Sequence, residues 1–193
     1  MRPPTLAPLY VGGVQLIAYA SRRLLDDTAR RDLLRSCSTN VDNLAAGRRT
    51  KLATSALLVE EPMELPYALL LLAVLGYAEY AHGAWWAAGV FALGHVGASL
   101  LVYGGLRAGR PPPATRSALD VGSSYGFYAV LGALTSALPR GAARTGARAA
   151  LLALTVRPLL RAGRTFTDAG HCAALGLGLG GALAVDYRSG GNR

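Results

Sequence analysis

The apolar stretch at residues 118–138 constrains the fold most strongly, because it is 21 residues long and carries no formal charge after Asp120. A run of this length and apolarity is typical of a helix that crosses a lipid bilayer. Its first turns nevertheless hold hydroxyl groups, and these are costly in hydrocarbon unless another group satisfies or uses them. Ser124, Tyr128 and Gly132 are four residues apart, so we expect them to share one helix face.

The composition is that of a membrane protein with several spans. The 193 residues are 52% hydrophobic and only 16% charged, with a mean hydropathy of +0.30. The charged residues lie in clusters between apolar runs, so we interpret the net charge of +9 as interfacial charge facing lipid headgroups and not as a nucleic-acid-binding surface. Cys37 and Cys172 form neither a metal-ligand spacing nor a disulfide framework, and we expect no metal and no cofactor.

Six apolar runs predict an all-α membrane protein, a six-transmembrane-helix bundle in a single domain over residues 1–193. The first run ends in arginines and not in a small-residue cleavage site, so we expect it to be retained in the cell membrane. Pro62 and Pro66 interrupt the second run, and prolines inside a span kink it. The predicted helices span residues 6–25, 53–80, 84–106, 118–138, 142–160 and 166–187.

Ser124 and His171 are the residues most able to carry chemistry. Each lies a few residues inside the start of its predicted helix, and the two helices run in the same direction because one helix separates them. Both are therefore expected at similar depth on the same side. A serine becomes a nucleophile when a base such as imidazole lies within hydrogen-bond reach. The pair is a candidate dyad for cutting peptide bonds at membrane level, and the alternative is that these groups only satisfy each other within the bundle.

The fourth and sixth runs resemble helices of the rhomboid family of intramembrane serine proteases. Residues 122–124 followed by Tyr128 and Gly132 are similar to the family's fourth-helix motif, Gly-x-Ser-Gly with Tyr-Ala and Gly at the same offsets. Residues 170–186 are similar to its sixth helix, in which the catalytic histidine precedes small residues. The resemblance implies a rhomboid-like bundle whose fourth and sixth helices pack closely.

Further likenesses extend the resemblance over all six helices. Residues 52–83 resemble the family's second helix and the turn after it, and Glu79 is expected to be structural and hydrogen-bonded in that turn. Residues 38–44 and 94–100 further resemble the rhomboid-like membrane proteins of actinobacteria.

The resemblance also implies roles for individual residues. Ser124 would be the nucleophile, His171 the general base and Tyr128 an aromatic ring stacked against His171, with Gly122 beside the nucleophile in the motif. The partners would be the lipid bilayer and the transmembrane helix of a membrane-protein substrate or client.

Three positions depart from the family pattern. Tyr125 replaces the glycine that follows the serine, and Glu64 and Ala68 stand where the family has the His and Asn that stabilise the oxyanion. Loss of one oxyanion donor typically lowers the rate ~10²–10³-fold. His95, in the third helix, is a candidate replacement donor.

Several functions therefore stay open. One is a rhomboid-type intramembrane serine endopeptidase, and another is a catalytically inactive pseudoprotease that binds client helices without cutting them. A third is a small transporter with Glu64, His95 and Asp120 as intramembrane polar sites. The orientation is open as well. The connections on the dyad side hold Lys51 and thirteen arginines, so the positive-inside rule favours the reverse of the family's outward-facing dyad.

Overall fold

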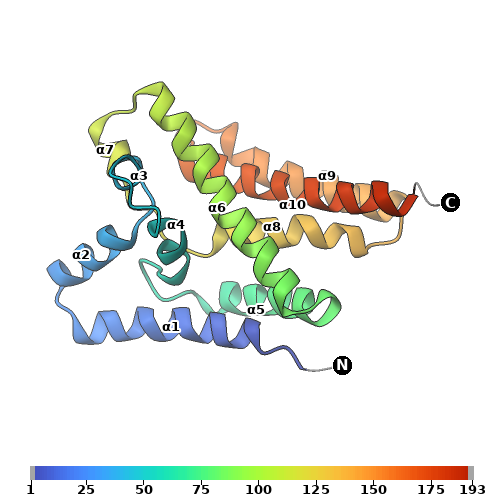
Figure 1. The fold of residues 1–193 in the computed structure, drawn as a ribbon, viewed down its shortest axis with the longest axis horizontal. Helices are drawn as coiled ribbons and strands as arrows, with labels where there is room; N and C mark the ends of the chain where they lie inside the picture. The colour runs from blue at the N-terminus through green and yellow to red at the C-terminus, as the bar shows by residue number, and fades with distance from the viewer. Residues whose placement is uncertain (1–2, 191–193) are drawn as a thin grey trace.

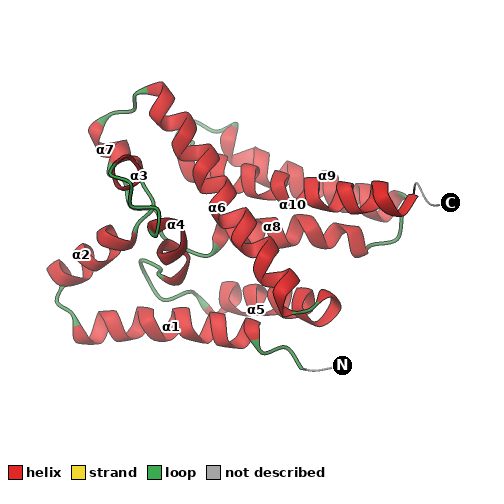
Figure 2. Ribbon diagram, in the orientation of Figure 1, coloured by secondary structure: helices red, strands yellow, loops and turns green. Residues whose placement is uncertain are grey.

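The structure, a computed structural model, describes the backbone of residues 3–190 and the side chains of residues 3–182. All regular secondary structure in that range is helical (Figure 2), which confirms the all-α prediction for the described residues. The helices that correspond to the six predicted apolar runs, called here the long helices although α8 has only 11 residues, are α1 (Leu6–Leu24), α5 (Leu65–His82), α6 (Ala84–Gly109), α8 (Ser124–Leu134), α9 (Ala142–Leu159) and α10 (Phe166–Gly190). The remaining helices, which connect these six, are α2 (Asp27–Cys37), α3 (Val41–Ala45), α4 (Lys51–Thr54), η1 (Ser55–Leu57), α7 (Pro113–Arg116) and η2 (Thr135–Ala137).

Helix α8 lies at the centre of the bundle (Figure 1) and packs most extensively against α10 and α6. Helix α9 packs on α10, while α1 and α5 pack on each other at the opposite edge. The short helices α2, α3, α4 and α7 gather at the end of the bundle where α8 and α10 begin (Figure 1). The start of α8, and with it Ser124, is therefore close to these short helices.

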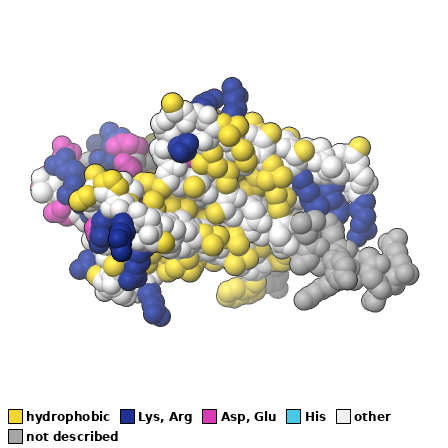
Figure 3. Space-filling view, turned by 90° about the horizontal axis from the view of Figure 1, so that it is seen from above, with side chains coloured by type: hydrophobic (Ala, Val, Ile, Leu, Met, Phe, Trp, Pro, Cys, Tyr) yellow, Lys and Arg dark blue, Asp and Glu magenta, His cyan; other side chains and the backbone are white. Residues whose placement is uncertain are grey.

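The surface is compatible with a membrane environment. Among the residues that the structure describes, α5 and α6 are long and apolar enough to cross a bilayer, judged by length and composition. Figure 3 shows hydrophobic side chains across the middle of the molecule, with Lys and Arg side chains grouped at its left and right ends and at its upper edge. Large apolar side chains such as Leu69, Leu93 and Leu101 are exposed, as lipid-facing residues are in a membrane protein. That the other four long helices also cross the membrane remains a prediction.

The second helix is shorter than the predicted span of 53–80. The chain forms the small helices α4 and η1, then leaves helical structure, and α5 begins only at Leu65. Pro66 sits in the first turn of α5, where the missing N–H group has no intrahelical acceptor to lose. The two prolines thus start the helix late where the sequence analysis expected only a kink within it.

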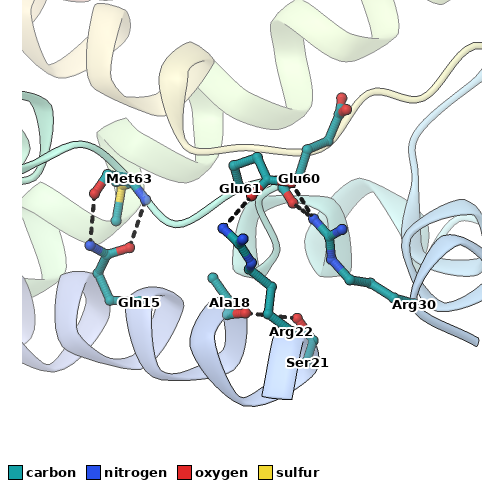
Figure 4. Close-up of polar contacts among 8 residues, drawn as sticks. All are labelled: Gln15, Ala18, Ser21, Arg22, Arg30, Glu60, Glu61 and Met63. Carbon is teal, nitrogen blue, oxygen red and sulfur yellow. Dashed lines mark hydrogen bonds and ion pairs between the residues drawn. The ribbon is translucent and has the colours of Figure 1, made fainter. Parts of the chain in front are cut away.

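The non-helical segment at residues 58–64 is fastened to α1 (Figure 4). The Gln15 amide donates to the Met63 carbonyl at 2.9 Å and accepts from the Met63 N–H at 2.7 Å. The Glu61 carboxylate forms ion pairs with Arg22 and Arg30, both at 2.7 Å. The hydrogen bond from Arg30 lowers the pKa of Glu61, so these pairs are complete at neutral pH and weaken as the pH falls through that lowered pKa. The pairs are exposed, and we therefore assign the fastening chiefly to the Gln15 amide.

Glu79, in the last turn of α5, caps the start of α1. Its carboxylate is buried and accepts hydrogen bonds from the backbone N–H groups of Thr5 at 2.8 Å, Leu6 at 3.0 Å and Ala7 at 3.0 Å. A helix start leaves its first N–H groups without intrahelical acceptors, and a carboxylate there also suits the positive end of the helix dipole. The predicted structural role of Glu79 is therefore present, but its partners belong to α1 and not to the turn after α5.

We expect Glu79→Ala to lower the free energy of unfolding by about 2–4 kcal/mol, because three backbone N–H groups lose their acceptor at a buried site. Glu79→Gln keeps one acceptor oxygen and is expected to lose less. Thermal unfolding of the protein in detergent measures both, with Glu61→Gln as a control that removes an exposed carboxylate. Equal stability of Glu79→Ala and Glu61→Gln would contradict the capping role.

Candidate functional site

The predicted helix at 118–138 is helical only from Ser124, which is the first residue of α8. Residues 118–123 form an irregular segment, named here the serine segment, and residues 135–137 continue as the 3₁₀ turn η2. Gly122 has a φ of +139°, a conformation that residues with a Cβ rarely adopt. The expected 21-residue helix is thus wrong at its start, because this glycine breaks the helical path just before the serine.

The serine segment obtains its hydrogen bonds from distant parts of the chain. The Asp120 N–H donates to Ser38 Oγ at 2.8 Å, and the Asp120 carbonyl accepts from the Thr39 N–H at 3.1 Å. The Gly122 N–H donates to the Ser55 carbonyl at 2.9 Å. These bonds satisfy the backbone groups that a helix would have paired internally. The connection between α1 and α5 therefore positions the start of α8.

Ser124 and His171 meet across α8 and α10. The distance between Ser124 Oγ and His171 Nε2 is 3.0 Å, within hydrogen-bond range. Both residues are half-buried. The Tyr128 ring lies against His171, with centroids 4.6 Å apart, and the Tyr125 ring meets His171 edge-on at 5.6 Å. Two aromatic side chains from α8 thus restrict the orientation of the imidazole beside the serine.

Small residues allow this approach of α8 to α10. A Cβ added at Gly178 would lie 2.0 Å from the Ala129 carbonyl oxygen, and one added at Gly132 would lie 2.8 Å from the Leu175 carbonyl oxygen. Ala174 and Ala182 of the same α10 face are buried. The expected packing role of Gly132 and Gly178 is therefore confirmed, because any larger side chain would separate the two helices.

A second serine–histidine pair lies deeper in the fold. Ser55 Oγ is 2.9 Å from His95 Nε2 and 2.8 Å from Thr39 Oγ1. Ser55 is 1% and His95 4% exposed, and this geometry is also compatible with a dyad. Among the described residues, the His95 Nδ1 atom and the Ser99 hydroxyl are buried without a hydrogen-bond partner. Substrate would have to reach a serine enclosed by protein, which makes this pair the weaker candidate.

Sequence reasoning missed the partner of His95, because no spacing relates Ser55 to a residue forty positions away. The sequence offered His95 as a candidate oxyanion donor, but in the structure its Nε2 atom lies within hydrogen-bond distance of Ser55 Oγ. The Tyr125 ring contacts both His95, at 6.1 Å, and His171, at 5.6 Å. The tyrosine that replaces the family's glycine therefore lies between the two histidine pairs.

Helix α5 contributes a hydroxyl group near Ser123, the residue before the candidate nucleophile. Glu64 is exposed just before α5 begins, and Ala68 is buried and has no donor. Tyr67, between these two aligned positions, brings its hydroxyl to 3.1 Å from Ser123 Oγ. Sequence analysis missed Tyr67, although its position beside Ala68 was a usable signal.

The start of α8 also presents polar hydrogens. Among the described residues, no acceptor is found for the backbone N–H groups of Ser124 and Tyr125. The first N–H groups of a helix and its dipole favour negative charge at this end. No three His, Cys, Asp or Glu side chains in the described part of the chain are close enough to bind a metal ion together.

Comparison with known proteins agrees with the helical bundle. A sequence profile of the family described as "Rhomboid-like protein" matches residues 6–189, nearly the whole chain. No curated protein and no solved structure gave a match. The family and the apolar helices α5 and α6 together indicate a membrane protein. Because the match covers far more than half of its length, the chain belongs to the rhomboid-like protein family.

Proposed function

We propose that this protein is an intramembrane serine protease that uses Ser124 as nucleophile and His171 as general base. The observation that carries the proposal is the 3.0 Å separation of Ser124 Oγ and His171 Nε2. Imidazole at this distance can accept the hydroxyl proton as the serine attacks a carbonyl carbon. Both residues are only half-buried and so partly accessible, unlike the enclosed Ser55–His95 pair.

The reaction follows from these positions. Ser124 Oγ bonds to the carbonyl carbon of the scissile peptide while its proton passes to His171 Nε2. The imidazolium then donates that proton to the leaving amine as the C–N bond breaks, and an acyl-enzyme remains. Water, deprotonated by His171, cleaves the acyl ester and restores the serine hydroxyl. Packing of Tyr128 against His171 keeps the ring directed at the serine through both stages.

The negative oxygen of the tetrahedral intermediate needs donors. The backbone N–H groups of Ser124 and Tyr125 lie at the positive end of α8, have no acceptor among the described residues, and could donate to this oxygen. They would act in place of the side-chain donors that the family carries at the positions of Glu64 and Ala68.

The setting we propose is the cell membrane, with α1, α5, α6, α8, α9 and α10 as six spans in a single domain. The substrate would be the transmembrane helix of another membrane protein, unwound near the start of α8. The backbone groups of the serine segment lie outside helical structure at this end of α8, and their hydrogen bonds to Ser38, Thr39 and Ser55 satisfy them without water.

A catalytically inactive pseudoprotease that binds client helices is the second candidate. It is favoured by one observation, the absence of a side-chain donor at Ala68 with Tyr125 occupying the space beside His171. In that case the 3.0 Å contact would only satisfy two polar groups within the bundle.

Labelling of purified protein in detergent with a fluorophosphonate, followed by peptide mapping, distinguishes these functions. We expect a covalent adduct on Ser124 and none on Ser55, because only the first serine is accessible. Protein that shows a cooperative thermal unfolding transition, and is therefore folded, but carries no adduct would contradict the protease and support the pseudoprotease. An adduct on Ser55 alone would contradict the assignment of the nucleophile.

A further inference from the structure

A hollow lies on the outer side of α6, at the same end of the bundle as Ser124. Its volume is about 450 Å³, and its walls come from α3, the start of α4 with the turn before it, and the last third of α6. Leu44, Leu52 and Leu100 give it an apolar wall. Leu100 is half exposed on a helix that is apolar enough to cross a bilayer, so the hollow opens where that apolar surface meets the polar connection.

Two arginines stand at this hollow. Arg49 comes from the turn before α4 and Arg107 from the last turn of α6. Both side chains are exposed, and neither has a hydrogen-bond or ion-pair partner among the residues that the structure describes. No acidic residue lines the hollow. The site therefore combines two uncompensated positive charges with an apolar wall.

Three other arginines at this end are paired with carboxylates, whereas Arg49 and Arg107 line the hollow without such a partner. Arg22 and Arg30 share Glu61, and Arg116 binds Asp42 at 2.9 Å. Acidic residues that pair with arginines are thus present at this end of the bundle, but none of them lines the hollow. A guanidinium without a carboxylate partner is well suited to a phosphate, which it can bind through two N–H groups at once.

We propose that this hollow binds an anionic phospholipid. Its phosphate would lie between Arg49 and Arg107, and the first part of an acyl chain would lie along Leu44, Leu52 and Leu100. The charge complementarity selects an anion, and the apolar wall, continuous with the exposed face of α6, selects an amphiphile over a soluble ion. The proposal does not depend on the chemistry of Ser124.

One residue that lines the hollow is hydrogen-bonded to the serine segment. Tyr103, which lines it, is buried and donates its hydroxyl to Asp120 Oδ2 at 2.5 Å. Asp120 lies four residues before Ser124, so the bound lipid would contact a wall that holds this segment in place.

Native mass spectrometry of the full-length protein in detergent, titrated with phosphatidylglycerol, tests the site. The test variant is Arg49→Gln/Arg107→Gln. The matched control, Arg23→Gln/Arg31→Gln, removes two exposed arginines of the same end that do not line the hollow. We expect the Kd to rise about thirtyfold in the test variant, since each arginine near anionic lipid contributes about 1 kcal/mol, and to change less than twofold in the control.

Three further arms make the result decisive. Arg49→Lys/Arg107→Lys retains both charges and is expected to bind better than the glutamine variant. Phosphatidylcholine, which has no net charge, is expected to bind the wild type more weakly than phosphatidylglycerol. Glycerol phosphate is expected to bind far more weakly, because it lacks the acyl chains. Equal losses in the two glutamine variants would overturn the proposal, as would glycerol phosphate binding as tightly as phosphatidylglycerol.

Discussion

Replacing Ser124 with alanine is expected to lower the rate of peptide-bond cleavage, and of fluorophosphonate labelling, by at least ~10⁴-fold. The change removes the hydroxyl oxygen that lies 3.0 Å from His171 Nε2 and that would form the proposed acyl-enzyme. His171→Ala leaves the hydroxyl but removes its base, and we expect a loss of similar size. Because the two residues act as a unit, the double variant should be no slower than either single variant.

Ser55→Ala is the matched control for this experiment. It removes a serine that also lies within hydrogen-bond distance of a histidine, 2.9 Å from His95, but is enclosed by protein. We expect Ser55→Ala to retain covalent labelling at Ser124, with a change confined to stability. Labelling that survives Ser124→Ala, or that is lost in a folded Ser55→Ala protein, would show that the reactive serine has been assigned to the wrong pair.

The second large effect is expected at Gly178, where α10 crosses α8. Gly178→Ala would place a Cβ 2.0 Å from the Ala129 carbonyl oxygen, and this contact is with backbone that cannot rotate away. We expect the free energy of unfolding to fall by about 3 kcal/mol, at the upper end of the usual cost of overpacking. Separation of the helices would also lengthen the Ser124–His171 contact. We therefore expect less labelling even among those protein molecules that remain folded.

Gly176→Ala on the same helix provides the control. Gly176 is exposed, and a Cβ there meets nothing within 4 Å. Alanine favours the helix over glycine by roughly 0.5–1 kcal/mol, so this variant is expected to be as stable as the wild type or slightly more stable. Thermal unfolding in the same detergent measures both. A Gly178→Ala protein as stable as Gly176→Ala would contradict the close helix contact.

Much of the helical framework could be predicted from local pattern. Long apolar runs predicted all six long helices, and the starts of α1, α6, α9 and α10 coincide with the predicted ones. The small residues of α10 indicated its close packing on α8, which Gly132 and Gly178 confirm. The exceptions are the starts of α5 and α8. There Pro66 and the positive φ of Gly122 set the boundary, which apolarity alone could not reveal.

What the sequence by itself determined is the set of apolar helices and the placement of Ser124 and His171 near the starts of two of them, because both follow from the order of residues along one segment. The tertiary structure alone decided which distant groups meet. Glu79 caps α1 from α5, Ser55 binds His95, and Ser38 and Thr39 fasten the serine segment. The physical reason is that each of these is a polar group whose partner is chosen by packing between helices. No spacing within a single segment encodes such a choice.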